Sequence, residues 1–92
     1  MSYAYELAEE ASRGLGELES WLAEEVLDEL EMLVSGPLSH KQRAPGGFVH
    51  DFVREQSGSR YYVFLTIVWD HTQQILRVSR IGQYVHRGPA ST

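Results

Sequence analysis

The residues that decide the fold are Arg60 to Arg87, RYYVFLTIVWDHTQQILRVSRIGQYVHR. The first ten are rich in β-branched and aromatic side chains, which favour extended structure, so they predict a long strand from Arg60 to Trp69. The polar sequence Asp70 to Gln73 predicts a turn, and Gln74 to Ile81 is then the returning strand of a hairpin. A short further strand is predicted at Tyr84 to His86.

The residues just before this hairpin extend the sheet. Phe48 to Glu55 (FVHDFVRE) has the alternation of a strand, and Ser57-Gly58-Ser59 is a turn signal that joins it to the long strand. The three strands therefore form an antiparallel meander.

The N-terminal part is helical. Apolar residues recur at helical spacing between Glu6 and Val34, which predicts two helices or one broken helix. Gly36-Pro37 ends this segment because proline cannot continue a helix. Ser2 to Leu7 alternates weakly and predicts a short first strand. The expected fold is therefore α+β, with two N-terminal helices packed on one face of a small antiparallel sheet.

A chain of 92 residues is long enough for one core, so we expect a single domain at residues 1–87 and a flexible tail at residues 88–92. There is no cysteine, which excludes disulfides and thiolate metal sites, and the four histidines lack metal-ligand spacing. We expect no metal and no cofactor. The start of the chain lacks a signal-peptide pattern and no apolar run approaches the length of about 20 residues that spans a bilayer, which predicts a cytoplasmic protein without membrane contact.

Charge is divided unevenly along the chain. The net charge is −5, yet residues 1–40 hold ten acids and one arginine, whereas residues 41–92 hold seven bases and three acids. The acidic half is typical of the solvated face of helices. The basic side chains of residues 41–92 are almost all arginine, the side chain suited to forked contacts with phosphate.

Both faces of the predicted long strand are apolar, whereas two helices can cover only one. Tyr61 begins the first set of alternate residues, and the second set contains Tyr62, Phe64 and Val68. We predict that this second face binds a partner through those three residues, whether a different protein or a second copy in a homodimer, unless the far half of the sheet curls over it.

Two arginines flank the first turn of the meander. Arg54 closes one strand and Arg60 opens the next, so the short turn is expected to bring them close together at one end of the sheet. Arg77 and Arg80 are three residues apart on a strand and are predicted to face opposite sides. A site for a developing phosphorane needs fixed positive charge and a group that transfers a proton. The C-terminal groups that could complete such a site are Tyr84, His86 and Arg87.

The order of elements resembles the RelE/ParE superfamily of bacterial toxins. The similar stretches are YAYELAEEASRGLGEL, LDELEMLVSGPL, FVREQSGSRYYVFLTIVWD and ILRVSRIG, which together cover about residues 3–84. The resemblance implies ribosome-dependent mRNA cleavage or poisoning of DNA gyrase, in either case silenced by a bound antitoxin.

Carried over by motif, Arg54 is similar to the family's arginine at the end of the second strand, and Arg60 to the one that opens the third. After Gly82 the family often continues with a histidine or lysine and then an arginine, whereas here the next bases are His86 and Arg87.

The resemblance leaves two hypotheses open. In the first, the chain is a metal-independent endoribonuclease in which Arg54 and Arg60 stabilise charge while Tyr84 or His86 handles a proton. The bases expected to contact RNA in that case are Lys41, Arg43, Arg80 and Arg87. In the second, the chain is a non-catalytic protein-binding module, either a gyrase inhibitor or a toxin relic.

Overall fold

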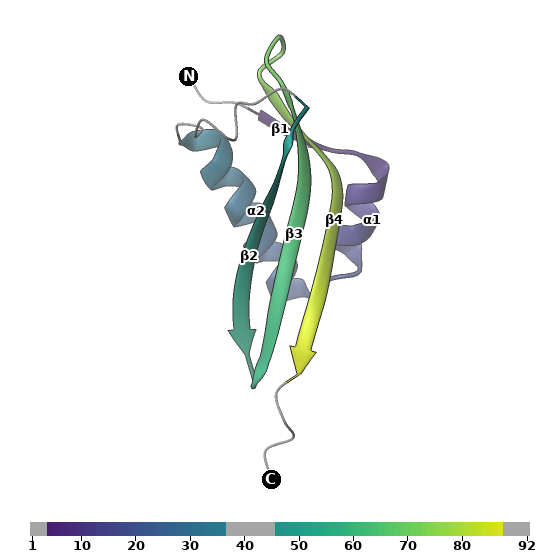
Figure 1. Cartoon of the computed structure of the whole chain (residues 1–92), viewed down its shortest axis with the longest axis vertical. Helices are drawn as coiled ribbons and strands as arrows, with labels where there is room; N and C mark the ends of the chain where they lie inside the picture. Colours follow the sequence, from purple (N-terminus) through teal and green to yellow (C-terminus); the bar gives the residue numbers. More distant parts are fainter. Residues whose placement is uncertain (1–3, 37–45, 88–92) are drawn as a thin grey trace.

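The computed structural model describes residues 4–36 and 46–87 (Figure 1). The elements are, in chain order, β1 (Ala4–Leu7), α1 (Glu9–Gly16), α2 (Ser20–Ser35), β2 (Phe48–Gln56), β3 (Ser59–Asp70) and β4 (Ile75–Arg87). The α+β fold and the short first strand are confirmed. The predicted bases Lys41 and Arg43 and the predicted tail lie outside the described residues.

The four strands form one sheet in the order β1-β4-β3-β2. β2, β3 and β4 are an antiparallel meander, but β1 pairs with β4 in the parallel direction, with Ala4 opposite Ile75 and Leu7 opposite Val78. The sheet is therefore mixed, which corrects the prediction of a purely antiparallel sheet. The helical connection from β1 makes this possible, because parallel strands need a long crossover.

β4 runs without a break to Arg87, which corrects the prediction of a strand ending at Ile81 and a separate one at Tyr84 to His86. Gly82 continues the strand because it lies opposite Phe64, whose ring occupies the space of a side chain. A Cβ atom at Gly82 would stand 2.3 Å from that ring. The glycine therefore lets an aromatic side chain lie across the sheet.

An irregularity interrupts the pairing of β3 with β4. Thr66 pairs with Arg80, but the next residue, Ile67, pairs with Val78, so Ser79 is an extra residue. Such a β-bulge leaves one residue unpaired and bends the strand. The Ser79 hydroxyl donates a hydrogen bond to the Thr66 carbonyl at 3.1 Å, which satisfies the backbone group left there.

The bulge changes which way the arginines of β4 point. Arg77 lies opposite Val68 and Arg80 opposite Thr66, and both partners belong to the same set of alternate β3 residues. The prediction that Arg77 and Arg80 face opposite sides is therefore wrong, because the extra residue shifts the alternation by one.

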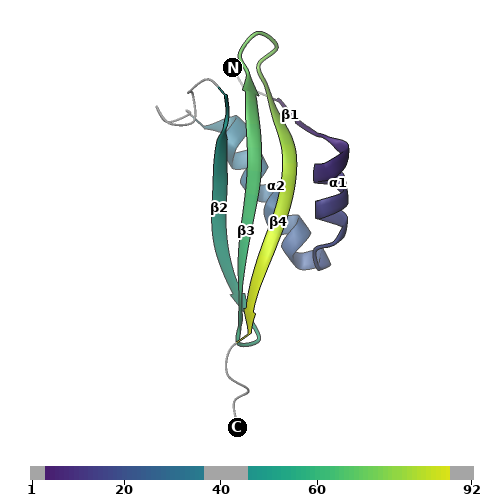
Figure 2. The ribbon, with the colours of Figure 1, turned by 45° about the vertical axis from the view of Figure 1, so that its right-hand side comes forward.

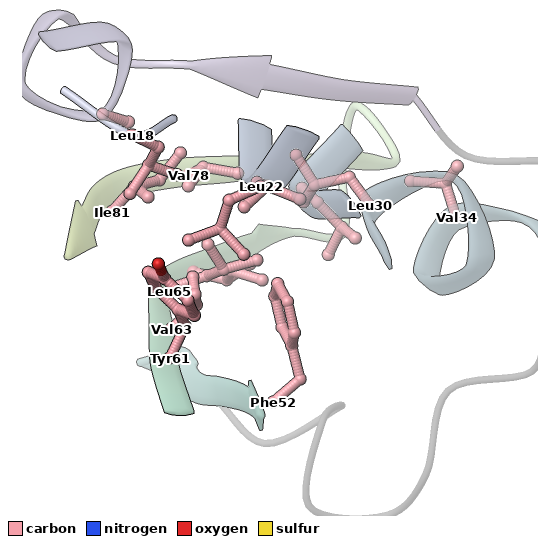
Figure 3. Packing of buried hydrophobic residues seen from close by; sticks show 14 of the residues in the cluster. Leu18, Leu22, Leu30, Val34, Phe52, Tyr61, Val63, Leu65, Val78 and Ile81 are labelled. Atoms are coloured by element: carbon pink, nitrogen blue, oxygen red, sulfur yellow. The ribbon is translucent and has the colours of Figure 1, made fainter. Parts of the chain in front are cut away.

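The helices cover one face of the sheet and leave the other open (Figures 1 and 2). The core lies between α2 and the covered face, where apolar side chains from helix and strands point toward one another (Figure 3). The core residues are Ala11, Leu18, Leu22, Val26, Leu30, Val34, Phe52, Tyr61, Val63, Leu65, Ile67, Trp69, Leu76, Val78 and Ile81. Full burial of one such side chain stabilises the fold by about 1.5–3 kcal/mol.

α1 approaches β4 closely through Gly14. A Cβ atom there would stand 2.1 Å from the backbone oxygen of Ile81, so only glycine fits. The helical glycine that weakens local helix propensity thus allows tight packing of helix on strand. No helix in the described part of the chain is long and apolar enough to cross a membrane.

Candidate functional site

The open face of the sheet carries large exposed side chains. Neither view of the ribbon places a helix over it (Figures 1 and 2). Its exposed apolar and aromatic residues are Val49, Val53, Tyr62, Val68 and Tyr84. The predicted partner-binding residues Tyr62, Phe64 and Val68 all lie on this face by strand alternation, and their role in binding stays a prediction.

Four polar and aromatic side chains gather where β3 begins and β4 ends. Arg60 lies directly opposite His86, and Tyr62 lies directly opposite Tyr84. These four residues, here called the hairpin-end cluster, line a shallow depression of about 360 Å³. The two tyrosine rings are 6.1 Å apart between centroids. The structure thus brings together three of the four predicted catalytic residues, Arg60, Tyr84 and His86.

The turn between β2 and β3 determines this arrangement. Gln56 pairs with Ser59, so the loop has only two residues, Ser57 and Gly58, both with positive φ. Such two-residue turns match the twist of the strands and fix their register. The register in turn places Glu55 directly opposite Arg60.

Glu55 holds Arg60 in place without burying it. One oxygen of Glu55, Oε1, accepts hydrogen bonds from Arg60 Nε at 2.9 Å and from Nη2 at 2.7 Å. The side chain of Tyr62 first, and then that of Glu55, raises the pKa of the Arg60 guanidinium, which therefore stays cationic. The side chains of Arg60 and Glu55 are 51% and 63% exposed, and such surface pairs contribute little. An incoming anion can therefore replace Glu55.

Arg54 is not part of this cluster. It lies opposite Tyr61, on the covered face, whereas Arg60 lies opposite Glu55, on the open face. The expectation that Arg54 and Arg60 come together is therefore not met. They are at one end of the sheet, but successive positions in the register place them on opposite sides of it.

On the covered face Arg54 joins β2 to α2. Its Nε donates to Glu25 at 2.6 Å and its Nη2 to Glu29 at 3.4 Å, while Glu29 also contacts His50 Nε2 at 2.9 Å. The hydrogen bond that Arg54 donates to Glu25 is the main cause that raises the pKa of Arg54. The guanidinium also lies 4.7 Å from the centre of the Phe52 ring, a cation–π distance. We call Glu25, Glu29, His50 and Arg54 the α2–β2 clasp.

The remaining predicted bases are separated. Arg80 is on the open face and is exposed, and it makes no ion pair with any described residue. Arg87 lies opposite Ser59, on the covered side of the sheet. These two arginines do not join the hairpin-end cluster.

Two members of the site were missed from sequence. The sequence predicts only a partner-binding role for Tyr62 and no role for Glu55. A two-residue loop at Ser57-Gly58 would have predicted the pairing of Glu55 with Arg60, because the loop length fixes the register. For the α2–β2 clasp, the i, i+4 spacing of Glu25 and Glu29 predicts that both carboxylates lie on one face of α2, where a single cation can contact them.

The cluster combines three capacities. Arg60 supplies fixed positive charge, His86 is an imidazole that can accept or donate a proton, and the tyrosines offer ring faces on which a nucleic acid base can stack. Because all of them are on an open surface, a large substrate could reach them.

No protein-family model matches the sequence, and no curated protein matches it. Solved structures do match the fold. The chain is similar to E. coli toxin RelE in the free state, in a double arginine-to-alanine mutant, with a TM-score of 0.65 and 19% identity over 89% of this chain and 83% of that one.

Two toxin–antitoxin complexes are also similar. RelBE2 of Mycobacterium tuberculosis gives a TM-score of 0.62 and 18% identity, covering 91% of this chain and 100% of the matched chain. The intact E. coli RelBE complex gives a TM-score of 0.62 and 18% identity, and the match covers 88% of this chain and 95% of the matched chain. The chain therefore has a RelE-like fold.

Proposed function

We propose that this chain is the toxin component of a type II toxin–antitoxin pair and that it cleaves RNA at the hairpin-end cluster. The similarity to RelE toxins, two of them in complexes with antitoxins, supports the toxin role and an antitoxin partner. The observation that carries the cleavage proposal is the convergence of Arg60, Tyr62, Tyr84 and His86 on one open face.

The proposed reaction is attack of an RNA 2′-hydroxyl on its adjacent phosphate. A bond forms between O2′ and phosphorus, and the bond from phosphorus to the 5′ oxygen of the next nucleotide breaks. His86 accepts the proton of the 2′-hydroxyl, and Tyr84 donates a proton to the departing 5′ oxygen. Arg60 stabilises the negative charge that develops on the phosphorane oxygens. Arg54 takes no part, because it is held in the α2–β2 clasp.

We propose mRNA on the ribosome as the substrate. The net charge of −5 disfavours association with free RNA, and Arg77 on the same face is already paired with Glu6 and Asp70. Because the ribosome already holds and positions the mRNA, a protein that acts there does not need a strongly basic surface of its own.

The test compares variants during expression in bacteria, with cleaved mRNA as the readout. We expect the wild type to arrest translation and Arg60→Ala to relieve the arrest, with a loss of cleavage of about 100- to 1000-fold, the size seen when a charge-stabilising donor is removed. Arg13→Ala, an exposed arginine on α1, is the matched control and should remain toxic. Arrest by Arg60→Ala as strong as that by wild type would overturn the proposal.

A second function is favoured by a different observation. The open face also exposes Val49, Val53 and Val68, which suit contact with protein more than with RNA. In this alternative the chain is a non-catalytic module that inhibits DNA gyrase or only binds its antitoxin. Growth arrest with intact translation and DNA damage would favour gyrase inhibition, and complete absence of toxicity would favour antitoxin binding alone.

A further inference from the structure

The last part of β4 is an uncovered sheet edge. β1 pairs only with residues Ile75 to Val78 of β4, so no described strand lies beside Gly82 to Arg87. This end of the strand extends past the helices (Figures 1 and 2). A row of unpaired backbone N–H and C=O groups is a template for another strand.

The opposite edge of the sheet, β2, is by comparison protected from pairing with another strand. Its covered side carries two charged or chargeable side chains, His50 and Arg54, both held by glutamates of α2. Inward-pointing charge is one device that discourages edge-to-edge pairing. On the covered side of this segment Gln83 and Val85 are uncharged, and Arg87, at the end of the strand, makes no ion pair with any described residue. From Gly82 to His86 the β4 edge therefore lacks this protection.

A cavity of about 380 Å³ adjoins the same edge. Its lining residues are Gly14, Glu17, Leu18, Ile81, Gly82 and Gln83. Glu17 is exposed and makes no ion pair with any described residue, so the cavity presents one uncompensated negative charge. A long cationic side chain complements this cavity in charge.

We infer that a second copy of this chain occupies this edge, so that two β4 strands pair antiparallel about a two-fold axis at Tyr84. Tyr84 then lies opposite its own symmetry mate, Gly82 opposite His86, and Gln83 opposite Val85. Side chains of matching faces meet, as a continuous sheet requires. The interface is isologous, so each contact occurs twice.

Charge selects this register. Arg87 is on the covered side of the sheet and makes no ion pair with any described residue. In the register centred on Tyr84 the pairing extends from Gly82 to His86, because Gly14 of α1 packs against the backbone oxygen of Ile81. Arg87 of the second copy then follows directly at the mouth of the cavity that Glu17 lines. A register centred on Gln83 would instead place Arg80 opposite His86, two groups that repel whenever the histidine is protonated. The inference is independent of RNA cleavage, although it would place two hairpin-end clusters next to each other on one eight-stranded sheet.

A single cysteine tests the two-fold axis, because the chain has none of its own. Directly opposed strand residues have Cα atoms about 4.5 or 5.5 Å apart, both within the span of a disulfide. Under mild oxidation we expect Tyr84→Cys to become mostly covalent dimer. The control is Val49→Cys on β2, on the same face and 56% exposed against 64% for Tyr84. Equal cross-linking of the two variants would overturn the inference.

A charge exchange tests the register. By sedimentation equilibrium we expect Glu17→Arg and Arg87→Glu each to raise the dimer dissociation constant by about tenfold, since each removes two ion pairs. The double variant should restore the wild-type value. Both sites are exposed, and far-UV circular dichroism checks that each variant folds. A chain that stays monomeric at millimolar concentration, or a dimer indifferent to the exchange, would overturn the inference.

Discussion

The two faces of β3 have similar compositions but different surroundings. The covered face presents Tyr61, Val63, Leu65, Ile67 and Trp69, all buried, whereas the open face presents Arg60, Tyr62, Phe64, Thr66 and Val68, none of them buried. Aromatic and β-branched side chains occur on both. The helices, and not the composition of the strand, therefore decide which face becomes core.

The arginines of the two faces differ in the same way. Arg54 on the covered face is 34% exposed and contacts Glu29, which is 11% exposed. Arg60 on the open face contacts a carboxylate that is mostly solvated. A charge pair with little solvent around it connects elements of the fold, whereas an exposed pair leaves its arginine available for a ligand.

The test with the largest expected effect on stability removes an apolar side chain from each face of β3. Leu65→Ala on the covered face should lower the free energy of unfolding by about 2–5 kcal/mol, because it leaves a cavity in the core. Val68→Ala on the open face should change it by less than about 0.5 kcal/mol. Urea denaturation measures both. Equal losses would mean that something covers the open face in solution.

The next test replaces Arg54 and Arg60 by alanine, each in a separate variant. Arg54→Ala should lower the free energy of unfolding by about 1–2 kcal/mol, a value reduced for partial solvent screening, because Glu29 loses a partner in a nearly buried position. Arg60→Ala should leave stability nearly unchanged while it abolishes toxicity. Thermal unfolding of both variants measures the two changes in stability. A larger loss of stability for Arg60→Ala would contradict the division of roles.

The smallest expected effect concerns Asp70 on the open face. The backbone N–H of Gln73 first, and then the Arg77 side chain, lowers the pKa of Asp70 below its ordinary value of 3.8. Its stabilising contribution is therefore present above that pH and is lost as the pH falls through the folded-state pKa. The stability difference between wild type and Asp70→Asn should shrink as the solution is acidified below about pH 4. A difference independent of pH would contradict this.

Local patterns predicted most of the fold. The helices, the hairpin and the two-sided apolarity of β3 all followed from spacing along the chain. The side of Arg54 was also within reach, because it lies two residues after the buried Phe52 and must share its face. The predicted meeting of Arg54 and Arg60 rests on their proximity to a turn, and proximity does not determine which face a side chain occupies.

Two features depended on distant parts of the chain. The parallel pairing of β1 with β4 joins segments about 70 residues apart, and no local pattern encodes the choice. The approach of α1 to β4 at Gly14 depends on the backbone of Ile81, which a helix-propensity argument does not consider. Long-range packing therefore overrides local preference at both places.

The bulge at Ser79 means that β4 consists of two segments with opposite phases of alternation. Before it, Leu76 and Val78 point to the core, and after it Ile81 does, although the spacing between the last two is odd. If β4 kept Ser79 but paired without the bulge, the odd spacing would transfer either Ile81 or Val78 to solvent. The bulge therefore keeps the core residues of β4 and the hairpin-end cluster on opposite sides of the sheet. Loss of Ser79 is thus the one change of length that this strand can accommodate, because Val78 and Ile81 would then lie two residues apart and still share the covered face.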